Sequence, residues 1–204
     1  MSASAWKKST VHETWETPYM RGEVADFFTP TRQVEPVRWT VVYRPAAIAV
    51  APVTAGGELL MIHQERIGSQ QTAWEFPAGQ IDEAHFRALD PASAEAEEIR
   101  RETVVRELQE EAGYCLAPDG GELVPLGRFF PSPGFTDEVV YLYLARPCVP
   151  HENGTNHDHG EAIVDVRGFA FAEFEARVAD GSQQDALSLA LYARLASRRD
   201  LRLG

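Results

Sequence analysis

The sequence has little cysteine and no long apolar run. Its 204 residues include two cysteines, Cys115 and Cys148, which form neither a CxxC motif nor a disulfide framework. We therefore expect two free thiols in a reducing compartment, the cytoplasm. No apolar stretch approaches the roughly 20 residues that a membrane-spanning helix needs. The first ten residues are polar and contain two lysines, so they do not resemble a secretory signal, and we expect no membrane partner.

Basic residues are also scarce relative to acidic ones. The chain has 19 Lys and Arg against 31 Asp and Glu, which gives a formal net charge of -12. Such a surface repels polyanions and argues against nucleic acid as a partner. A small anion that binds through divalent cations remains compatible. With 44% apolar and 25% charged residues, the composition is typical of a globular protein, and the length suits one domain with an appended element.

A long helix is predicted in the middle of the chain. Asp90 followed by Pro91 is a helix start, because Asp accepts hydrogen bonds from first-turn amides and Pro fits the first helical position. Gly113 is a helix end. At 100° per residue, one side of this helix is apolar and predicts a face toward the core. That face consists of Val105, Leu108 and Ala112.

Three glutamates, Glu107, Glu110 and Glu111, are expected on the other side of this helix. Like charges at such spacings repel by about 0.2 to 0.5 kcal/mol per pair. Two of them also lie in the last turn, where the helix dipole disfavours an anion by about 0.3 to 1 kcal/mol. A divalent cation would reverse both effects, and clustered carboxylates suit Mg²⁺ or Mn²⁺. The alternative interpretation is an ordinary solvated acidic face.

The residues around these glutamates resemble the signature of the Nudix hydrolases, G-x5-E-x7-R-E-U-x-E-E-x-G-U, in which U is a bulky apolar residue. Tyr114 is aromatic at the last position, where aliphatic residues are commoner. Eighteen residues, where the signature has five, separate Gly79 from Glu98, so the chain carries an insertion of thirteen. Glu102 is therefore an alternative to Glu98 as the partner of Arg106. The matching residues are Gly79, Glu98, Arg106, Glu107, Glu110, Glu111 and Gly113, of which the resemblance makes Gly79, Glu98, Arg106 and Gly113 structural.

The resemblance implies an α/β fold, an α/β/α sandwich with a mixed β-sheet, over residues 46–204. We expect residues 1–45 to form a β-rich extension. In the extension, residues 37–43 alternate with a period of two and predict a half-buried strand. The aromatic side chains of Trp6, Trp15 and Trp39 need a surface, either their own domain or a second copy of the chain. Because related enzymes are homodimers through such strands, the resemblance implies a homodimer.

The other predicted elements follow from periodicity and turn residues. The almost wholly apolar run 46–53 predicts a strand that is buried on both faces. Residues 182–185, Ser-Gln-Gln-Asp, resemble a capping box that opens the last helix. Further strands are expected at 58–64, 122–130, 138–145 and 163–166, and a further helix at 169–178.

A second segment, Ser132-Pro133-Gly134, is similar to one that marks the ADP-ribose pyrophosphatase branch of the family. This resemblance implies that the backbone carbonyl of Ala78 and the three glutamates bind Mg²⁺, with Mn²⁺ as an alternative. Glu161 matches the catalytic base, and Glu152 is the alternative. Glu107 and Glu110 also take part in catalysis. The implied substrate contacts are Arg66, Glu75, Pro133, Gly134 and Glu138.

The function implied is that of a Mg²⁺-dependent pyrophosphatase. It would hydrolyse ADP-ribose, or a related small-molecule nucleoside diphosphate sugar, to AMP and ribose 5-phosphate in the ADP-ribose case. Cleavage of a UDP- or GDP-sugar is one alternative, because the sequence does not reveal the pocket that reads the base. A Nudix-fold sensor that binds a nucleotide without hydrolysing it is another, although all three signature carboxylates are present here.

Overall fold

The computed structural model describes residues 6–82, 84–157, 160, 162–198 and 201. The chain divides into two compact units, one made of residues 1–46 and 130–139 and the other of residues 47–129 and 140–204. The first unit therefore contains a segment, 130–139, that sequence reasoning did not group with the N-terminal extension.

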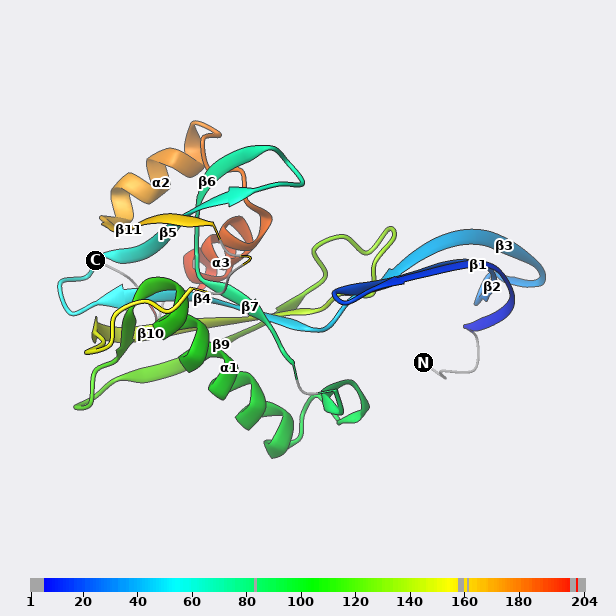
Figure 1. Cartoon of the computed structure of the whole chain (residues 1–204), viewed down its shortest axis with the longest axis horizontal. Coiled ribbons are helices and arrows are strands. Elements are labelled where there is room, and N and C mark those ends of the chain that lie inside the picture. The colour runs from blue at the N-terminus through cyan, green and yellow to red at the C-terminus, as the bar shows by residue number, and fades with distance from the viewer. Residues whose placement is uncertain (1–5, 83, 158–159, 161, 199–200, 202–204) are drawn as a thin grey trace. The chain divides into compact units, whose positions relative to one another are not determined.

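The first unit is a three-stranded antiparallel sheet in the order β1-β2-β3 (Figure 1). Its strands are β1 (Lys7–Thr17), β2 (Met20–Thr29) and β3 (Arg32–Tyr43). The expected strand at 37–43 is the end of β3, but its alternation does not bury Trp39, which is 52% exposed. A single layer of three strands leaves large side chains on its faces in solvent.

Residues 130–139 are hydrogen-bonded to β3. The amide of Val42 donates to the carbonyl of Phe135 over 2.7 Å, and the amide of Asp137 donates back to Val42 over 3.2 Å. The indole Nε1 of Trp39 donates to the carbonyl of Gly134 over 2.7 Å. These contacts hold the Ser-Pro-Gly segment against the sheet of the first unit.

The second unit is built on a mixed sheet, which has eight strands in the part of the chain that the structure describes. The main path runs β11-β5-β4-β10-β8, with β6 paired to β5, β7 to β4 and β9 to β10. β4 and β10 are parallel and the other pairs are antiparallel. The strands are β4 (Ala47–Thr54), β5 (Leu59–Arg66), β6 (Gln71–Glu75), β7 (Ala78–Gln80), β8 (Tyr114–Leu116), β9 (Glu122–Phe129), β10 (Val140–Pro150) and β11 (Ile163–Phe169).

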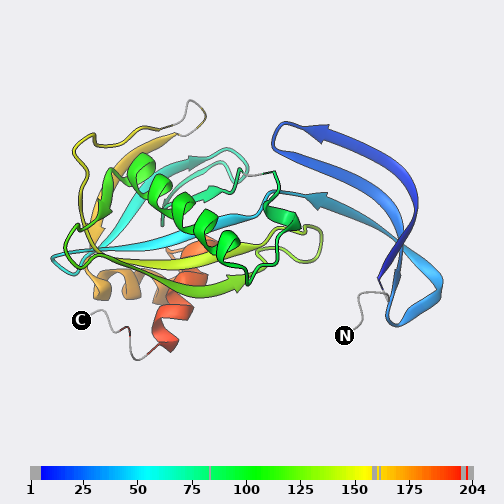
Figure 2. The same cartoon turned by 90° about the horizontal axis from the view of Figure 1, so that it is seen from below.

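Helices cover both faces of this sheet. In Figures 1 and 2, α1 (Ala94–Ala112) lies on one side of the strands, and α2 (Phe171–Ala179) and α3 (Ala186–Ser197) lie on the other. The main core cluster includes Phe174 of α2 and Leu191 of α3, both fully buried. The expected α/β/α sandwich with a mixed sheet is confirmed. No helix in the described part of the chain is long and apolar enough to cross a membrane.

The start of α1 differs from the prediction. Ser93 is the N-cap and accepts from the amide of Ala96 over 3.1 Å. Asp90 instead accepts from the amide of Ala92 over 2.9 Å, which closes a separate turn before the helix. The expected end is confirmed, because Gly113 has φ 71° and caps the helix in the left-handed conformation.

The last helix also begins later than predicted. Asp185 is the N-cap of α3 and accepts from the amides of Leu187 and Ser188. Ser182 lies in a turn in which its amide donates to Asp180 over 2.8 Å. The predicted capping box at Ser182 was therefore wrong, since Asp185 supplies the acceptor for the free amides of the first turn.

The buried side of α1 agrees with the prediction at Leu108 and Ala112 but not at Val105. Val104 and Leu108 are fully buried, whereas Val105 is 45% exposed. Glu107 and Glu111 share the buried side, with 4% and 2% exposure, because positions three and four apart lie on one face. The expectation that these carboxylates face away from the core was wrong.

The insertion after Gly79 packs on the main sheet. It contains a 3₁₀ turn, η2 (Phe86–Ala88), in which Phe86 is buried. The ring of Phe86 meets Tyr141 edge-on at 5.9 Å, and the guanidinium of Arg100 lies 4.5 Å from the Tyr141 ring. Arg100 also donates to the carbonyl of Pro91 over 3.1 Å, so the insertion is fixed to α1 and β10.

Candidate active site

Gly79 and Glu107 lie in very close contact where β7 passes α1. A Cβ atom built on Gly79 would be 1.8 Å from Oε1 of Glu107. No side chain fits there while Glu107 keeps its position. The carboxylate of Glu107 therefore sits directly on the backbone of β7, which explains why glycine occupies this position.

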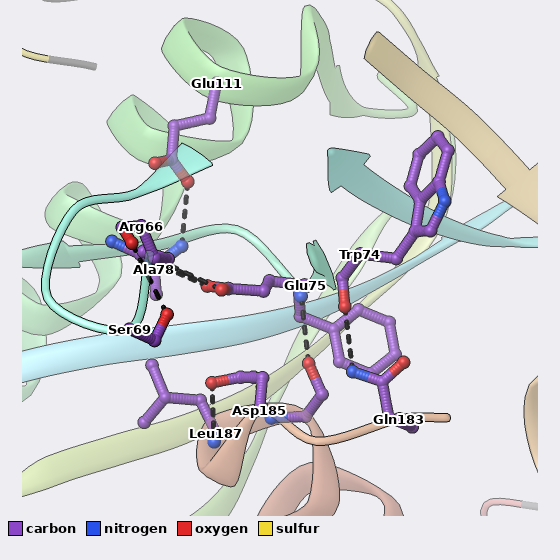
Figure 3. A network of polar contacts seen from close by, with 11 residues as sticks. Arg66, Ser69, Trp74, Glu75, Ala78, Glu111, Gln183, Asp185 and Leu187 are labelled. Atoms are coloured by element: carbon purple, nitrogen blue, oxygen red, sulfur yellow. Dashed lines mark hydrogen bonds and ion pairs between the residues drawn. The ribbon is translucent and has the colours of Figure 1, made fainter. Parts of the chain in front are cut away.

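Glu111 lies beside the preceding residue of the same strand. Its Oε2 accepts a hydrogen bond from the amide of Ala78 over 2.8 Å (Figure 3). The structure thus brings together the backbone of residues 78 and 79 and the carboxylates of Glu107 and Glu111. Ala78, Glu107 and Glu111 are among the metal ligands that the family resemblance implies. β7 is placed there by its pairing with β4, in which Ala78 is opposite Ala49.

Arg106 connects the carboxylates of α1 to the insertion. It forms ion pairs with Glu107 at 2.9 Å, Glu110 at 3.0 Å and Asp82 at 3.3 Å, and it donates to the carbonyl of Gln80. Burial alone would lower the pKa of Arg106, but the charges of Glu107 and Glu110 raise it above its ordinary value. Asp82 was missed by sequence reasoning, because it lies in the insertion and no spacing rule points to it.

The expected partner of Arg106 is not found among these contacts. Glu98 and Glu102 are both exposed on α1. The ion pairs of Arg106 in the described part of the chain run to other carboxylates. The structural role assigned to Glu98 therefore gains no support from these contacts.

The donor chemistry of these residues fits a hard divalent cation. The proposed ligands are carboxylate oxygens and one backbone carbonyl, as Mg²⁺ and Mn²⁺ prefer. Among the described residues, no group of three or more acidic, His or Cys side chains converges on one point. Arg106 forms ion pairs with Glu107 and Glu110, whereas the Ala78 amide donates to Glu111, so the three carboxylates are divided between two donors.

Arg66 and Glu75 form a second pair on the neighbouring strands. Nε of Arg66 donates to Oε1 and Oε2 of Glu75 over 3.1 and 3.0 Å, as Figure 3 shows. Glu75 is 4% exposed. Burial alone would lower the pKa of Arg66, but the hydrogen bonds and charge of Glu75 outweigh it and raise the pKa. Glu75 thus holds the guanidinium of Arg66, while 44% of the Arg66 side chain remains exposed to solvent.

Two side chains at the start of α3 contact the backbone of Trp74 and Phe76, the residues on either side of Glu75. Gln183 donates to the carbonyl of Trp74 over 2.8 Å, and the hydroxyl of Ser188 accepts from the amide of Phe76 over 3.1 Å. Sequence reasoning missed both side chains. Ser188 falls on the helix side that carries Leu191 and Leu195, and a polar residue on a core face is a signal for a buried hydrogen bond.

The remaining predicted residues belong to the first unit or to the loop after β10. Pro133, Gly134 and Glu138 belong to the first unit, where Glu138 lies 3.6 Å from Nε of Arg44. Glu161 lies outside the described residues, so its role as the catalytic base stays a prediction. Glu152, the alternative, is exposed.

The loop that carries Glu152 is attached to the end of α1. The amide of His151 donates to the carbonyl of Gly113, and the amide of Asn156 to that of Glu110, both over 2.9 Å. An imidazole nitrogen of His157 lies 3.2 Å from the carbonyl of Glu111. Helix α1 and this loop are therefore connected by hydrogen bonds up to residue 157.

Comparisons with known proteins identify the family of this chain. The chain matches the NUDIX domain over residues 42–190. It is 32% identical over 123 residues to the ADP-ribose pyrophosphatase of Bacillus subtilis (strain 168), which covers 60% of this chain and 57% of that protein. Identity, length and coverage are the same for a methanol dehydrogenase activator of Bacillus methanolicus.

Two further similarities concern another relative and a solved structure. The ADP-ribose pyrophosphatase of Mycobacterium tuberculosis (strain ATCC 25618 / H37Rv) is 31% identical over 150 residues, 74% of this chain and 64% of that protein. A crystal structure of an ADP compounds hydrolase superposes with a TM-score of 0.67 at 15% identity, covering 97% of this chain and 95% of the other. The matches span less than two thirds of the length of these curated relatives.

Proposed function

Because the chain belongs to the NUDIX domain family, we propose that it is a metal-dependent hydrolase of ADP-ribose or a closely related nucleoside diphosphate sugar. Cleavage of the diphosphate of ADP-ribose would give AMP and ribose 5-phosphate. The observation that carries the proposal is the contact of two buried glutamates, Glu107 and Glu111, with the backbone at Ala78 and Gly79. Two curated relatives with the name ADP-ribose pyrophosphatase support the choice of substrate.

The acidic residues of α1 would hold the metal in this proposal. Glu107, Glu110, Glu111 and the carbonyl of Ala78 are the ligands we propose, for Mg²⁺ or alternatively Mn²⁺. The ion supplies neutralisation of the diphosphate charge and acidification of a bound water. Arg106 keeps Glu107 and Glu110 close together despite their like charges, because it pairs with both.

Arg66 is the group we propose for binding the diphosphate. A guanidinium fits phosphate oxygens through several N–H groups in a fixed plane. Glu75 occupies Nε and one Nη of Arg66, so the orientation of the guanidinium is set before a substrate binds. Pro133, Gly134 and Glu138 remain proposed substrate contacts through the resemblance of their segment.

A carboxylate from the loop after β10 would accept a proton from the attacking water. Glu161 is our first candidate and Glu152 the alternative. Replacing each separately by Gln distinguishes them, because loss of the base lowers kcat by about 10²-fold to 10⁴-fold while the other change leaves it nearly intact.

We also propose a homodimer in the cytoplasm, formed through the first unit. Its sheet exposes large apolar side chains of a kind that is enriched at protein interfaces. The exposed ones are Trp6, Val11, Trp15, Tyr19, Val34 and Trp39.

The decisive experiment is incubation of the full chain with ADP-ribose, with and without Mg²⁺, followed by chromatography of the products. We expect AMP and ribose 5-phosphate to form only when Mg²⁺ is present. Cleavage of UDP- or GDP-sugars in preference to ADP-ribose would replace the proposed substrate. Binding without cleavage of any of them would indicate a sensor and contradict the proposal.

Replacement of Glu111 by Gln tests the site itself. Gln keeps an oxygen for the Ala78 amide but removes the negative charge, so we expect an unchanged fold and a loss of at least about a hundredfold in kcat. Glu95→Gln is the matched control, because Glu95 is exposed in the first turn of the same helix. Wild-type turnover in Glu111→Gln would contradict the assignment.

A further inference from the structure

Strand β6 is held on both of its edges. One edge pairs with β5, where Glu75 is opposite Ile62 and Trp74 is opposite His63. On the other edge, the carbonyl of Trp74 and the amide of Phe76 are met by side chains from the start of α3. In an extended strand, the carbonyl of one residue and the amide two positions later point to the same edge. Gln183 and Ser188 thus take the place of a neighbouring strand.

These two side chains are themselves fixed. Gln183 is 3% exposed and Ser188 is fully buried. Asp185, the N-cap of α3, accepts from the amide of Ser188 over 2.7 Å, which sets the first turn of the helix. Figure 3 shows the resulting arrangement, in which the start of α3 lies against the segment from Trp74 to Ala78.

The metal side of the segment has separate attachments. The carbonyl of Pro77 accepts from the amide of Val50 over 2.9 Å, and the amide of Ala78 donates to Glu111. A change at Gln183 or Ser188 therefore acts first on residues 74–76 and leaves the contacts of Ala78 in place. Glu75 lies between the two residues that α3 holds, and its carboxylate fixes Arg66.

We propose that Gln183 and Ser188 are positioning residues that set Glu75 and, through it, the orientation of Arg66 toward a substrate diphosphate. The inference rests on the proposed function for the identity of the ligand, but the geometry of the Arg66–Glu75 pair can be tested without any substrate. Neither side chain contacts Arg66 directly, so the effect passes through the backbone on either side of Glu75.

The test uses two variants and a control from the same helix. Ser188→Ala removes the acceptor for the Phe76 amide, and Gln183→Met removes the donor to Trp74 at nearly the same length. Ser197→Ala removes a hydroxyl at the other end of α3. This hydroxyl donates to the backbone carbonyl of Arg194 over 2.8 Å. All measurements are made in the full chain, well below the melting temperature of each variant.

The first measurement is the ¹⁵N–¹H resonance of Arg66 Nε, identified by its loss in Arg66→Lys. We expect a shifted resonance and faster exchange with water in Ser188→Ala and Gln183→Met, and no change in Ser197→Ala. Titration with inorganic pyrophosphate and Mg²⁺, followed on this resonance, should show an affinity that is about threefold to tenfold lower in both variants, the effect of one lost hydrogen bond.

The second measurement separates binding from chemistry. With ADP-ribose, KM should rise by about threefold to tenfold in both variants while kcat stays within about twofold, because the weakened contact is equally strong in the ground state and the transition state. The affinity for Mn²⁺, measured by electron paramagnetic resonance, should not change. A lower melting temperature with an unchanged Arg66 resonance would overturn the proposal, as would a shifted resonance with unchanged affinity for pyrophosphate.

A failure of the proposed function can be distinguished from a failure of this inference. In that case the wild-type chain would not cleave ADP-ribose, yet the resonance and the pyrophosphate titration would still show whether α3 positions Arg66. Those two measurements alone then support or overturn the inference.

Discussion

At the scale of single residues, burial decides the chemistry of the two cysteines. Cys148 is 1% exposed on β10, whereas Cys115 is half-buried on β8. Burial raises the pKa of the Cys148 thiol to about 12. Both residues are described, and they form no disulfide with each other. The free thiols expected from the sequence are thus present, but they differ in their surroundings.

We predict that alkylation of the native chain is selective for Cys115. The thiolate is the reactive form, and at pH 8 a thiol with a pKa of about 12 is almost wholly protonated. Brief treatment with iodoacetamide at pH 8, read by peptide mass spectrometry, should label Cys115 and spare Cys148. Denaturation before treatment should label both. Equal labelling in the native chain would contradict the burial of Cys148.

At the scale of elements, the sequence specifies some features of α1 and not others. Its end at Gly113 is predictable because the backbone there needs a positive φ. Its start is not, since Asp90 and Ser93 are both good caps and only the fold of the insertion selects Ser93. The burial of Glu107 is also hidden from sequence, because its carboxylate occupies the space that a side chain at Gly79 on β7 would fill.

The same contrast applies to the candidate site. Glu111 and the backbone of Ala78 are adjacent in the structure, and both were named from the resemblance to the family. Gln183 is 109 positions from Trp74, and Ser188 is 112 positions from Phe76, in the sequence. No local spacing carries such contacts, which arise from the packing of α3 on the main sheet.

We predict that Gly79→Ala impairs activity far more than stability. The new methyl group would meet the end of the Glu107 side chain, which can rotate away at a cost of about 1 to 3 kcal/mol. Rotation moves the carboxylate out of the proposed metal site, so kcat should fall by at least about tenfold. Gly68→Ala is the control, because nothing lies within 4 Å of a Cβ there. Steady-state kinetics and thermal melts measure both effects, and unimpaired turnover in Gly79→Ala would refute the argument.

A buried carboxylate also ties together the three strands of the first unit. Glu23 on β2 is 1% exposed and contacts Lys8 on β1, Arg21 on β2 and Tyr43 on β3. Burial alone would raise the pKa of Glu23, but the hydrogen bonds from Lys8, Tyr43 and Arg21 together hold it below its ordinary value. A lowered pKa means that this cluster stabilises the folded sheet above the ordinary pKa of glutamate and loses that contribution as pH falls through the folded pKa.

We predict that Glu23→Gln destabilises the first unit at pH 7 by about 1 to 3 kcal/mol, the cost of a lost charged hydrogen-bond partner. The difference from wild type should shrink as the pH falls through the folded pKa of Glu23, because the wild-type carboxylate then becomes protonated too. Tryptophan fluorescence during thermal melts reports mainly on the first unit, since Trp6, Trp15 and Trp39, three of the four tryptophans, lie there. Glu35→Gln, an exposed change on β3, should follow wild type at every pH. A difference that stays constant with pH would contradict the role of the Glu23 charge.

At the scale of the whole molecule, the two units differ in what they leave exposed. The second unit buries a large apolar core between the sheet and its helices, and exposes Ile67, Val105 and Val164. The first unit exposes Trp6, Tyr19 and Val34 at 67%, 69% and 94%. Scattered exposed apolar residues are normal, but a concentration of aromatic ones in a single small unit supports the proposed dimer contact. The net charge of -12 keeps copies apart unless such a surface overcomes the repulsion.

We therefore predict that the chain elutes as a dimer of about twice its 22.7 kDa mass in size-exclusion chromatography with light scattering. Val11→Glu should shift the equilibrium toward monomer, because a charge on the exposed face of β1 would be buried without a partner in the interface. Val105→Glu is the matched control, since Val105 on α1 is 45% exposed and Val11 is 44% exposed. A wild-type chain that elutes as a monomer would refute the dimer. Equal dissociation by both substitutions would instead locate the contact outside the sheet of the first unit.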